Sequence, residues 1–442
     1  MPKAAAFAIP RVSRAALLAV IVGAAPLAAQ GQPAQTVVAV RAGRLLDVEH
    51  GQVLRDRVIL IRGDRISAVQ PGSSAVPPGA RVIDLSRYTV LPGLIDCHSH
   101  LVGEAEAADV LEPLERTETQ DAMSGVRNAR ATLLAGFTSV RDVGTYRAFV
   151  DVGLRDAIDD GTVIGPRMEV AGAYVTVTGG GGEVVGAAPD VVVPPAFRFG
   201  VANTADQVRE RVRAILNGGA DFIKIIATGA VLTHGTQPGA SEYTEEQLHA
   251  AVEQAAQYGT FVAAHAHGAE GIKRAVRAGV RSIEHGSLVD DEGIALMKQR
   301  GTWLVADIWN GDYIDSVGRA QHWSDEILRK NTETTDAQRV GFRKAVAAGV
   351  HIAYGTDSGV YPHGLNAMQL PYMVKYGLTP MQAVQSATIS AARLMRWEDR
   401  VGSIAAGKYA DVIAVEGDAL ADLHSFMKVP FVMKGGVVYK AP

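Results

Sequence analysis

Two histidines, His98 and His100, lie one residue apart at the end of the apolar run "LPGLIDCHSH", residues 91–100. Side chains alternate along an extended strand, so both imidazoles are expected to point to the same side. Two imidazoles on one side of a strand are a possible ligand pair for a divalent metal ion. An H-x-H pair also arises by chance, so the rest of the chain must decide.

Four other apolar segments end in a group that binds metals or transfers protons. They are Lys224 in "DFIKIIAT", His265 in "TFVAAHAH", His285 in "RSIEHGS" and Asp357 in "HIAYGTDS". Each has a structural explanation when taken singly, because a strand-end histidine is often a hydrogen-bonded core residue and an aspartate often caps the next helix. Gathered at one face of a fold, the set instead indicates a catalytic centre.

The elements that must position these groups read as alternating strands and helices. Helical stretches such as 204–219 and 244–259 separate eight expected strands, at 89–100, 137–144, 167–175, 221–228, 260–267, 281–287, 302–308 and 351–358. Eight such units predict a (β/α)₈ TIM barrel, in which catalytic groups lie at the carboxyl ends of the strands. A doubly wound sheet is the alternative, disfavoured because no G-x-G-x-x-G follows an early strand.

Both ends of the mature chain have a different texture, with short β-branched runs punctuated by glycine and proline. We therefore expect a small composite β-sandwich domain built from residues 30–90 and 399–442, with the barrel at 91–398. Basic residues followed by the apolar stretch "AALLAVIVGAAPLAA" (15–29) are typical of a secretory signal peptide, expected to be cleaved after Ala29. An uncleaved anchor is the alternative. Cleavage would give a periplasmic or secreted protein with no further membrane association.

Composition limits the remaining classes. The 442 residues are 48% hydrophobic, and 43 Lys and Arg against 47 Asp and Glu give a net charge of -4, so no polybasic surface suggests nucleic-acid binding. The single cysteine, Cys97, excludes an intramolecular disulfide and is expected to fill the core. Alanine-rich helix faces suit barrel packing or subunit contacts, and a homo-oligomer is expected.

The donor set fits two divalent cations of borderline softness, with zinc as the default metal. Such a pair lowers the pKa of bound water and polarises a carbonyl, which amide hydrolysis requires. Asp357 would orient the water and carry its proton to the leaving nitrogen. Lys224 cannot coordinate as an ammonium, but a neutral amine can react with CO₂ to give a carbamate able to bridge both metals. A solvent-facing Lys224 fits poorly inside "FIKII".

Five motifs, "GLIDCHSH", "DFIKIIATG", "AHAHG", "IEHG" and "GTDSG", resemble the binuclear amidohydrolase superfamily in order and context. The flanking "GDRISAV" and "GKYADVIAV" are similar to its composite β domain. The resemblance implies His98 and His100 on one metal, with Asp357 as acid-base on the same ion. It places His265 and His285 on the other metal and carboxylated Lys224 between the two.

Within that superfamily the chain looks most like the imidazolonepropionase-like branch, which contains prolidases, carboxypeptidases and ochratoxin-hydrolysing amidases. By resemblance, Tyr243, His267 and His363 would be substrate-side residues. A histidine that often follows the first glycines of the "TGG" loop is replaced here by Gly181 or Gly182. The four glycines at 179–182 predict a mobile loop near the active face.

The expected function is an exported amidohydrolase that cleaves the C-terminal amide bond of small peptides or N-acyl amino acids, including ochratoxin-like amides. The alternatives are a cyclic amidohydrolase, a lactonase, and a barrel that only binds or supports other molecules. Arg141 and Asp142 in "TSVRDVG" are expected to form a structural ion pair beneath the site.

Overall fold

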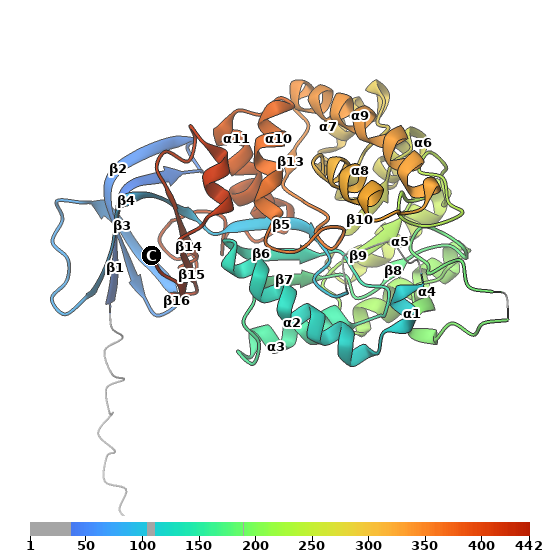
Figure 1. The fold of residues 1–442 in the computed structure, drawn as a ribbon, viewed down its shortest axis with the longest axis horizontal. Coiled ribbons are helices and arrows are strands. Elements are labelled where there is room, and N and C mark those ends of the chain that lie inside the picture. The colour runs from blue at the N-terminus through green and yellow to red at the C-terminus, as the bar shows by residue number, and fades with distance from the viewer. Residues whose placement is uncertain (1–36, 104–110, 189) are drawn as a thin grey trace, which may run out of the picture. The chain divides into compact units, whose positions relative to one another are not determined.

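The computed structural model describes residues 37–103, 111–188 and 190–442. They form an α/β domain with parallel strands at its centre and a sheet built from both ends of the chain (Figure 1). The predicted signal segment, 1–29, lies outside the described residues. Within the described ranges, every helix is too short or too polar to cross a bilayer.

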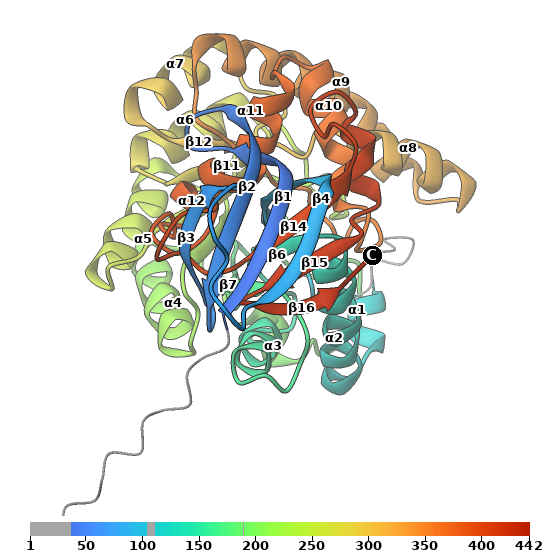
Figure 2. The ribbon, with the colours of Figure 1, turned by 90° about the vertical axis from the view of Figure 1, so that its left-hand side faces the viewer.

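The sheet from the two ends has seven strands. They are β1 (Val37–Asp47), β2 (Gln52–Arg62), β3 (Arg65–Pro71), β4 (Arg81–Pro92), β14 (Val412–Glu416), β15 (Phe431–Lys434) and β16 (Val437–Lys440), in the order β16-β15-β14-β4-β1-β2-β3 (Figure 2). Val40, Ile59 and Val412 are among the residues of its buried apolar cluster.

The predicted composite of both termini is present, but as one mixed sheet rather than a sandwich of two. The reason is that β4 pairs in parallel with β1 along one edge and antiparallel with β14 along the other. A single ladder therefore joins the N-terminal and C-terminal strands. The expected boundary at residue 90 falls inside β4, which continues to Pro92.

The parallel strands follow the predicted segments. They are β5 (Leu94–Ser99), β6 (Phe137–Asp142), β7 (Arg167–Val170), β8 (Tyr174–Val175), β9 (Ile223–Ile226), β10 (Val262–Ala266), β11 (Ser282–His285), β12 (Trp303–Val305) and β13 (Ile352–Ala353). They make two parallel sheets, β5-β6-β7 and β13-β12-β11-β10-β9-β8. The expected strand at 167–175 appears as β7 and β8, separated by a bend at Gly172, where φ is +71°.

Backbone contacts also connect the first parallel strand with the segment after the last one. The carbonyl of His98 accepts from the amides of Thr356 at 3.2 Å and Asp357 at 2.8 Å, and Ser99 forms a parallel bridge with Ser358. These bonds bring the ends of β5 and the segment after β13 together. A barrel-like arrangement follows, with strand carboxyl ends on one face.

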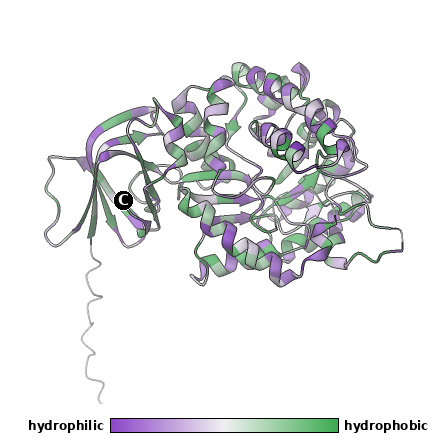
Figure 3. Ribbon diagram, viewed as in Figure 1, coloured by the Kyte–Doolittle hydropathy of each residue, from purple (hydrophilic) through white to green (hydrophobic). Residues whose placement is uncertain are grey.

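Apolar residues of the helices, such as Leu248, Ile272 and Met297, lie in the main hydrophobic core. The helices surround the strands and carry both hydrophobic and hydrophilic residues (Figure 3). They are α1 (Glu112–Glu115), α2 (Glu118–Leu134), α3 (Val150–Asp159), α4 (Ala205–Asn217), α5 (Glu245–Gln257), α6 (Ala269–Ala278), α7 (Asp291–Arg300), α8 (Asn310–Ala320), α9 (Asp325–Ala348), α10 (Gln369–Lys375), α11 (Pro380–Gln385) and α12 (Ala391–Leu394). Short 3₁₀ turns occur at Pro195–Arg198, Asn366–Met368 and Leu423–Met427, and a π turn at Ser386–Ser390.

Local sequence explains where the two predicted helices begin. Thr204 caps α4 by accepting from the amide of Gln207, and Thr244 caps α5 in a reciprocal box with Gln247. Each cap satisfies backbone amides that the first helical turn leaves without partners. The caps therefore fix the residue at which each helix begins. This also fixes where the chain leaves the end of the preceding strand.

Candidate active site

His98 and His100 meet Asp357 at the carboxyl end of β5. The Nε2 atoms of both imidazoles lie 3.3 Å from Oδ1 of Asp357. Asp357 has φ +57°, a left-handed conformation that is uncommon for residues other than glycine. Strained backbone of this kind persists where the surroundings hold it, and it concentrates at functional sites.

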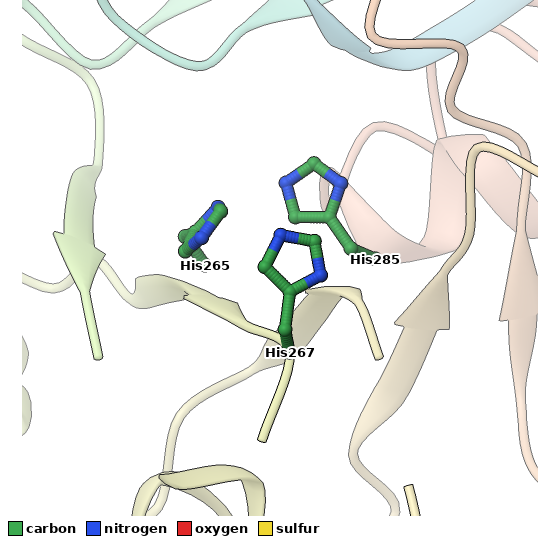
Figure 4. Close-up of side chains that lie close together, drawn as sticks. All are labelled: His265, His267 and His285. Carbon is green, nitrogen blue, oxygen red and sulfur yellow. The ribbon is translucent and has the colours of Figure 1, made fainter. Parts of the chain in front are cut away.

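A second cluster lies at the ends of β10 and β11, where the rings of His265, His267 and His285 face one another (Figure 4). The centroid of the His265 ring lies 4.6 Å from the ring centroid of His267 and 4.6 Å from that of His285. His285 also has a left-handed backbone, with φ +66°.

The two clusters overlap at His285. Its ligand atom lies within 4.8 Å of those of His265 and His267, and also of those of His98 and Asp357. Imidazole and carboxylate donors at such spacing suit divalent ions of borderline softness. The sequence assigned His267 to the substrate, but the structure places it among the possible ligands.

Three of the imidazoles are oriented by a partner on Nδ1. His98 donates to Glu284 at 2.9 Å, His285 to Asp307 at 3.1 Å and His100 to the Gly144 carbonyl at 2.8 Å. Each acceptor binds the Nδ1–H and fixes the ring so that Nε2 faces the site, where the Nε2 atoms of His98 and His100 lie 3.3 Å from Asp357. The ring orientations are therefore prepared for ligation.

Neither of these carboxylates was among the site residues predicted from the sequence. Asp307 lies in the expected strand 302–308, and Glu284 directly precedes His285. Strict alternation would send Glu284 and His285 to opposite faces. Both reach the site because the left-handed backbone of His285 ends the extended geometry there. The sequence signal that could have identified Glu284 is its position directly before His285, a candidate metal ligand.

Burial sets the protonation of the second cluster. It lowers the pKa of His265 far below its usual value and that of His267 to about 3, with the neighbouring His285 adding to both shifts. For His285, burial also lowers the pKa, but the charge of Asp307 outweighs it and the pKa is raised. Neutral imidazoles are the form that coordinates a metal ion.

Lys224 lies on β9 and is 2% exposed, with its side chain lining the same cavity. Burial lowers the pKa of its amine to about 8, while the carboxylates of Glu284 and Asp357 act in the opposite direction. Among the described residues, the Lys224 amine has no hydrogen-bond partner. A substantial neutral fraction near pH 8 follows.

Arg141 and Asp142 do not pair with each other, contrary to expectation. Neighbouring residues on β6 point to opposite sides, so the guanidinium of Arg141 binds Glu284 at 2.7 Å. The carboxylate of Asp142 instead accepts from the amides of Leu101 at 2.7 Å and Gly144 at 3.1 Å. Both remain structural residues beneath the site, with different partners.

The five histidines of the two clusters, Lys224 and Asp357 line a cavity of about 270 Å³. Tyr146, Tyr174 and Phe197 supply aromatic wall, and Asn310 and Gln338 supply polar wall from α8 and α9. The cavity can hold a small ligand with both an apolar part and hydrogen-bonding groups.

The glycine-rich segment reaches the cavity as expected, but it is packed rather than open. Gly181 and Gly182 are buried and line the cavity, and the amide of Gly181 donates to Glu242 at 2.9 Å. A Cβ on Gly182 would stand 2.8 Å from Ile226. Close packing therefore explains why no side chain is present there.

Two of the expected substrate residues do not line the cavity. Tyr243 is 1% exposed in the main hydrophobic core, and its hydroxyl donates to the Ala202 carbonyl at 2.8 Å. His363 lies behind the site, with Nε2 3.0 Å from the His100 carbonyl and Nδ1 3.1 Å from Thr132. Tyr243 therefore packs in the core and His363 supports the backbone of His100, and neither lines the cavity.

Comparison with known proteins agrees with this geometry. A model of the amidohydrolase family matches residues 89–439. Ochratoxinase from Aspergillus niger is 32% identical over 441 residues, covering 94% of this chain and 89% of that protein. Imidazolonepropionase from Streptococcus sanguinis is 25% identical, covering 84% and 86%. A solved Xaa-Pro dipeptidase with bound methionine has a TM-score of 0.87 at 39% identity, covering 92% of this chain and 100% of that one. The chain therefore belongs to the amidohydrolase family and is a hydrolase acting on amide carbon–nitrogen bonds.

Proposed function

We propose that this protein is a binuclear metal-dependent amidohydrolase that cleaves the amide bond of a C-terminal residue in small peptides and N-acyl amino acids. The observation that carries the proposal is the overlap of two donor clusters at His285, inside one cavity that also holds Lys224 and Asp357. Each donor is either oriented by a hydrogen-bond partner or held in the charge state that binds a metal ion.

The proposed ligand set divides the donors between two ions. His98, His100 and Asp357 would hold one ion, and His265 and His285 the other, with zinc the default metal. When bound, such ions supply an activated water and polarise the substrate carbonyl. His267 belongs to the second cluster but is kept as a substrate contact, with its Nδ1 hydrogen-bonded to Ser287 at 2.8 Å.

Lys224 is proposed to be carboxylated and to bridge the two ions. Its neutral amine nitrogen would bond to the carbon of CO₂ and lose a proton, giving an anionic carbamate with two oxygen donors. Burial and the lowered pKa, about 8, support the neutral amine that this step needs.

Asp357 is proposed to move the proton. Hydrogen bonds from His98 and His100 outweigh burial and keep its pKa well below the usual value, so it is ionised and can accept a proton from water. Passing that proton to the leaving nitrogen would release the amine product. The aromatic wall of Tyr146 and Phe197 would receive an apolar part of the substrate.

The relatives support this substrate class over its rivals. The names ochratoxinase and Xaa-Pro dipeptidase, at 32% and 39% identity, both describe proteins that act on amides. Because imidazolonepropionase is also similar, at 25% identity, a cyclic amide is the second candidate substrate.

The test is a panel at equal metal loading: N-acyl-phenylalanine, its methyl ester at the free carboxylate, and a cyclic imide. We expect the free acid to have the highest kcat/KM, with the ester reduced on the order of 10 to 100-fold by loss of a charge-assisted contact. Asp357→Asn serves as the inactive control. Faster turnover of the imide or the ester would replace the carboxypeptidase assignment.

A further inference from the structure

Arg147 lies in the turn that follows β6, next to the proposed metal centre. The turn begins at Gly144, whose carbonyl lies 2.8 Å from Nδ1 of His100. The hydroxyl of Thr145 donates to the Arg147 carbonyl at 3.1 Å, which keeps the turn tight. Thr145, Tyr146 and Arg147 all line the cavity. The side chain of Arg147 therefore starts only three residues after the group that orients a candidate ligand.

The guanidinium of Arg147 is held in place by three contacts. Nε donates to Oδ2 of Asp121 at 3.1 Å, and Nη2 donates to the carbonyl of Arg116 at 2.7 Å. The central carbon of the guanidinium lies 4.5 Å from the centre of the Phe197 ring, within the range of a cation–π contact. These contacts leave the cation little freedom to move.

One end of this guanidinium remains available to a ligand. Among the described residues Nη1 of Arg147 has no hydrogen-bond partner, and the side chain is 14% exposed. Nη1 is also not one of the unpaired polar atoms that are closed off from solvent. A guanidinium is always charged, and Nη1 alone offers two N–H donors. The cavity wall therefore presents a fixed positive charge with unused donors.

The other charged groups near Arg147 have partners of their own. Glu112, also in the cavity wall, forms an ion pair with Arg116 at 3.5 Å. Asp121 divides its two oxygens, because Oδ1 accepts from Nε of Arg116 at 2.9 Å. Apart from Lys224, which is assigned to the proposed bridge, no other lysine or arginine lines the cavity in the described part of the chain. Arg147 thus shares its carboxylate partner and has capacity for a second one.

We propose that Arg147 binds the free carboxylate of the C-terminal residue of the substrate, and that it selects amides in which this carboxylate is free. The inference rests on the proposed function, whose substrate class needs a group that holds that carboxylate. Tyr243 and His363, the substrate-side residues expected from the sequence, lie outside the cavity wall. Arg147 lies within it.

The selection has a physical basis in the shape and charge of the two groups. A planar guanidinium matches the two oxygens of a carboxylate, and the charge on both partners makes such hydrogen bonds stronger than neutral ones. A neutral carboxamide in the same place offers one oxygen and no charge. Holding the carboxylate also fixes how far the substrate extends beyond the scissile bond, so the enzyme is expected to release a single residue.

The experiment compares N-acyl-phenylalanine with its primary amide, in which a neutral carboxamide replaces the carboxylate. Cleavage of the scissile bond releases the same acyl acid from both, and this acid is the product measured. In the metal-loaded wild type the free acid should have the higher kcat/KM, on the order of 10 to 100-fold. In Arg147→Gln this ratio should shrink by about 10-fold, because the charge is missing for both substrates.

Two further variants separate charge from structure. Arg147→Lys keeps the charge without the planar fork, so its ratio should lie between those of the wild type and Arg147→Gln. Arg147→Met gives the same measurement if the glutamine variant does not fold. A purely structural role of Arg147 would lower kcat/KM equally for both substrates and leave the ratio unchanged.

Arg198→Gln is the matched control. The guanidinium of Arg198 forms an ion pair with Glu183 of the cavity wall, but Arg198 itself does not line the cavity. Its ratio between the two substrates should equal that of the wild type, whatever its overall activity.

A wild-type preference for the free acid that persists undiminished in Arg147→Gln and Arg147→Met overturns this inference and leaves the proposed function intact. A wild type that cleaves both substrates without preferring the free acid overturns the carboxypeptidase assignment and the inference with it. A wild type that cleaves neither substrate also overturns both.

Discussion

Glu284 joins the buried guanidinium of Arg141 to the imidazole of His98. One carboxylate oxygen accepts from Nη2 of Arg141 at 2.7 Å, and the other from Nδ1 of His98 at 2.9 Å. Arg141 and Glu284 are both 0% exposed. Burial raises the pKa of Glu284, but the charge of Arg141 outweighs it and keeps the carboxyl ionised. A structural ion pair thereby fixes the tautomer of a candidate metal ligand.

Replacing Glu284 by alanine should therefore damage both stability and metal binding. It leaves Arg141 charged and buried without its partner, a change that costs about 3 to 5 kcal/mol in comparable sites. Loss of the partner on His98 should weaken metal affinity about 10 to 100-fold. Chemical denaturation and metal titration measure the two effects. Glu284→Gln keeps the shape but also removes the charge, so it should lose nearly as much stability as Glu284→Ala, and a much smaller loss in Glu284→Gln would contradict the charge argument.

Lys224→Ala should lose most activity, because the proposed bridge between the ions is removed. Short carboxylic acids that enter the vacated space should restore part of it, since they supply two oxygens in the place of the carbamate. Activity at increasing acetate or propionate concentration is the measurement. The Lys224→Arg variant is the control that keeps the charge but cannot form a carbamate, and it should respond to neither acid. Full activity of Lys224→Ala without added acid would exclude the bridge.

Much of the fold was predictable because it depends on local pattern. The eight strand segments, the helices 204–219 and 244–259, and a β domain composed of both chain ends follow from hydrophobic periodicity and turn residues. The single ladder through β4 was not predictable, since it depends on which strands share an edge. Residue type alone contains no such information.

The candidate site shows the same limit. Strand-end position was enough to predict that His98, His100 and Asp357 lie together, because parallel strands end on one face. It could not show that His285 has a left-handed backbone, which admits Glu284 to the same centre. Nor could it show that Tyr243 turns into the core, because its hydroxyl finds a backbone carbonyl there.

Metal removal should abolish activity and also lower the free energy of unfolding, because the ions bind the folded chain and not the unfolded one. Elemental analysis of pure protein should find close to two divalent ions per chain. His285→Ala should lower the content most, since this residue belongs to both donor clusters. His363→Ala, behind the site, is the comparison that should retain metal. Undiminished turnover after exhaustive chelation would contradict the metal-dependent proposal.

Export is proposed from the basic start and the apolar run at 15–29. Intact-mass measurement of protein from the native host should show a chain that begins at Gln30. A variant with two apolar residues of the run changed to aspartate should stay in the cytosol with its full length. Full-length wild-type protein recovered from the cytosol would refute cleavage.

The buried carboxyl of Glu169, which is not among the proposed metal ligands, should make the free energy of unfolding depend on pH. The residue is 5% exposed on β7, and one carboxyl oxygen has no hydrogen-bond partner within the described part of the chain. Burial raises its pKa from 4.5 to about 8, against the opposing charge of Arg141. Between those two values the folded chain holds a proton that the unfolded chain has released. The free energy of unfolding contributed by this group must therefore fall as pH rises from about 4.5 to 8.

Glu169→Gln keeps the shape of the side chain but cannot ionise, so it should remove that dependence. The variant should gain little over the wild type near pH 5 and be more stable by a few kcal/mol, on the order of the linkage energy, near pH 8. Urea denaturation of both proteins at pH 5, 6, 7 and 8 measures the difference. Glu210→Gln, an exposed carboxylate on α4, should show no such trend. A difference that stays constant from pH 5 to 8 would mean that the Glu169 carboxyl is ionised throughout, with a partner in the folded protein that compensates its burial.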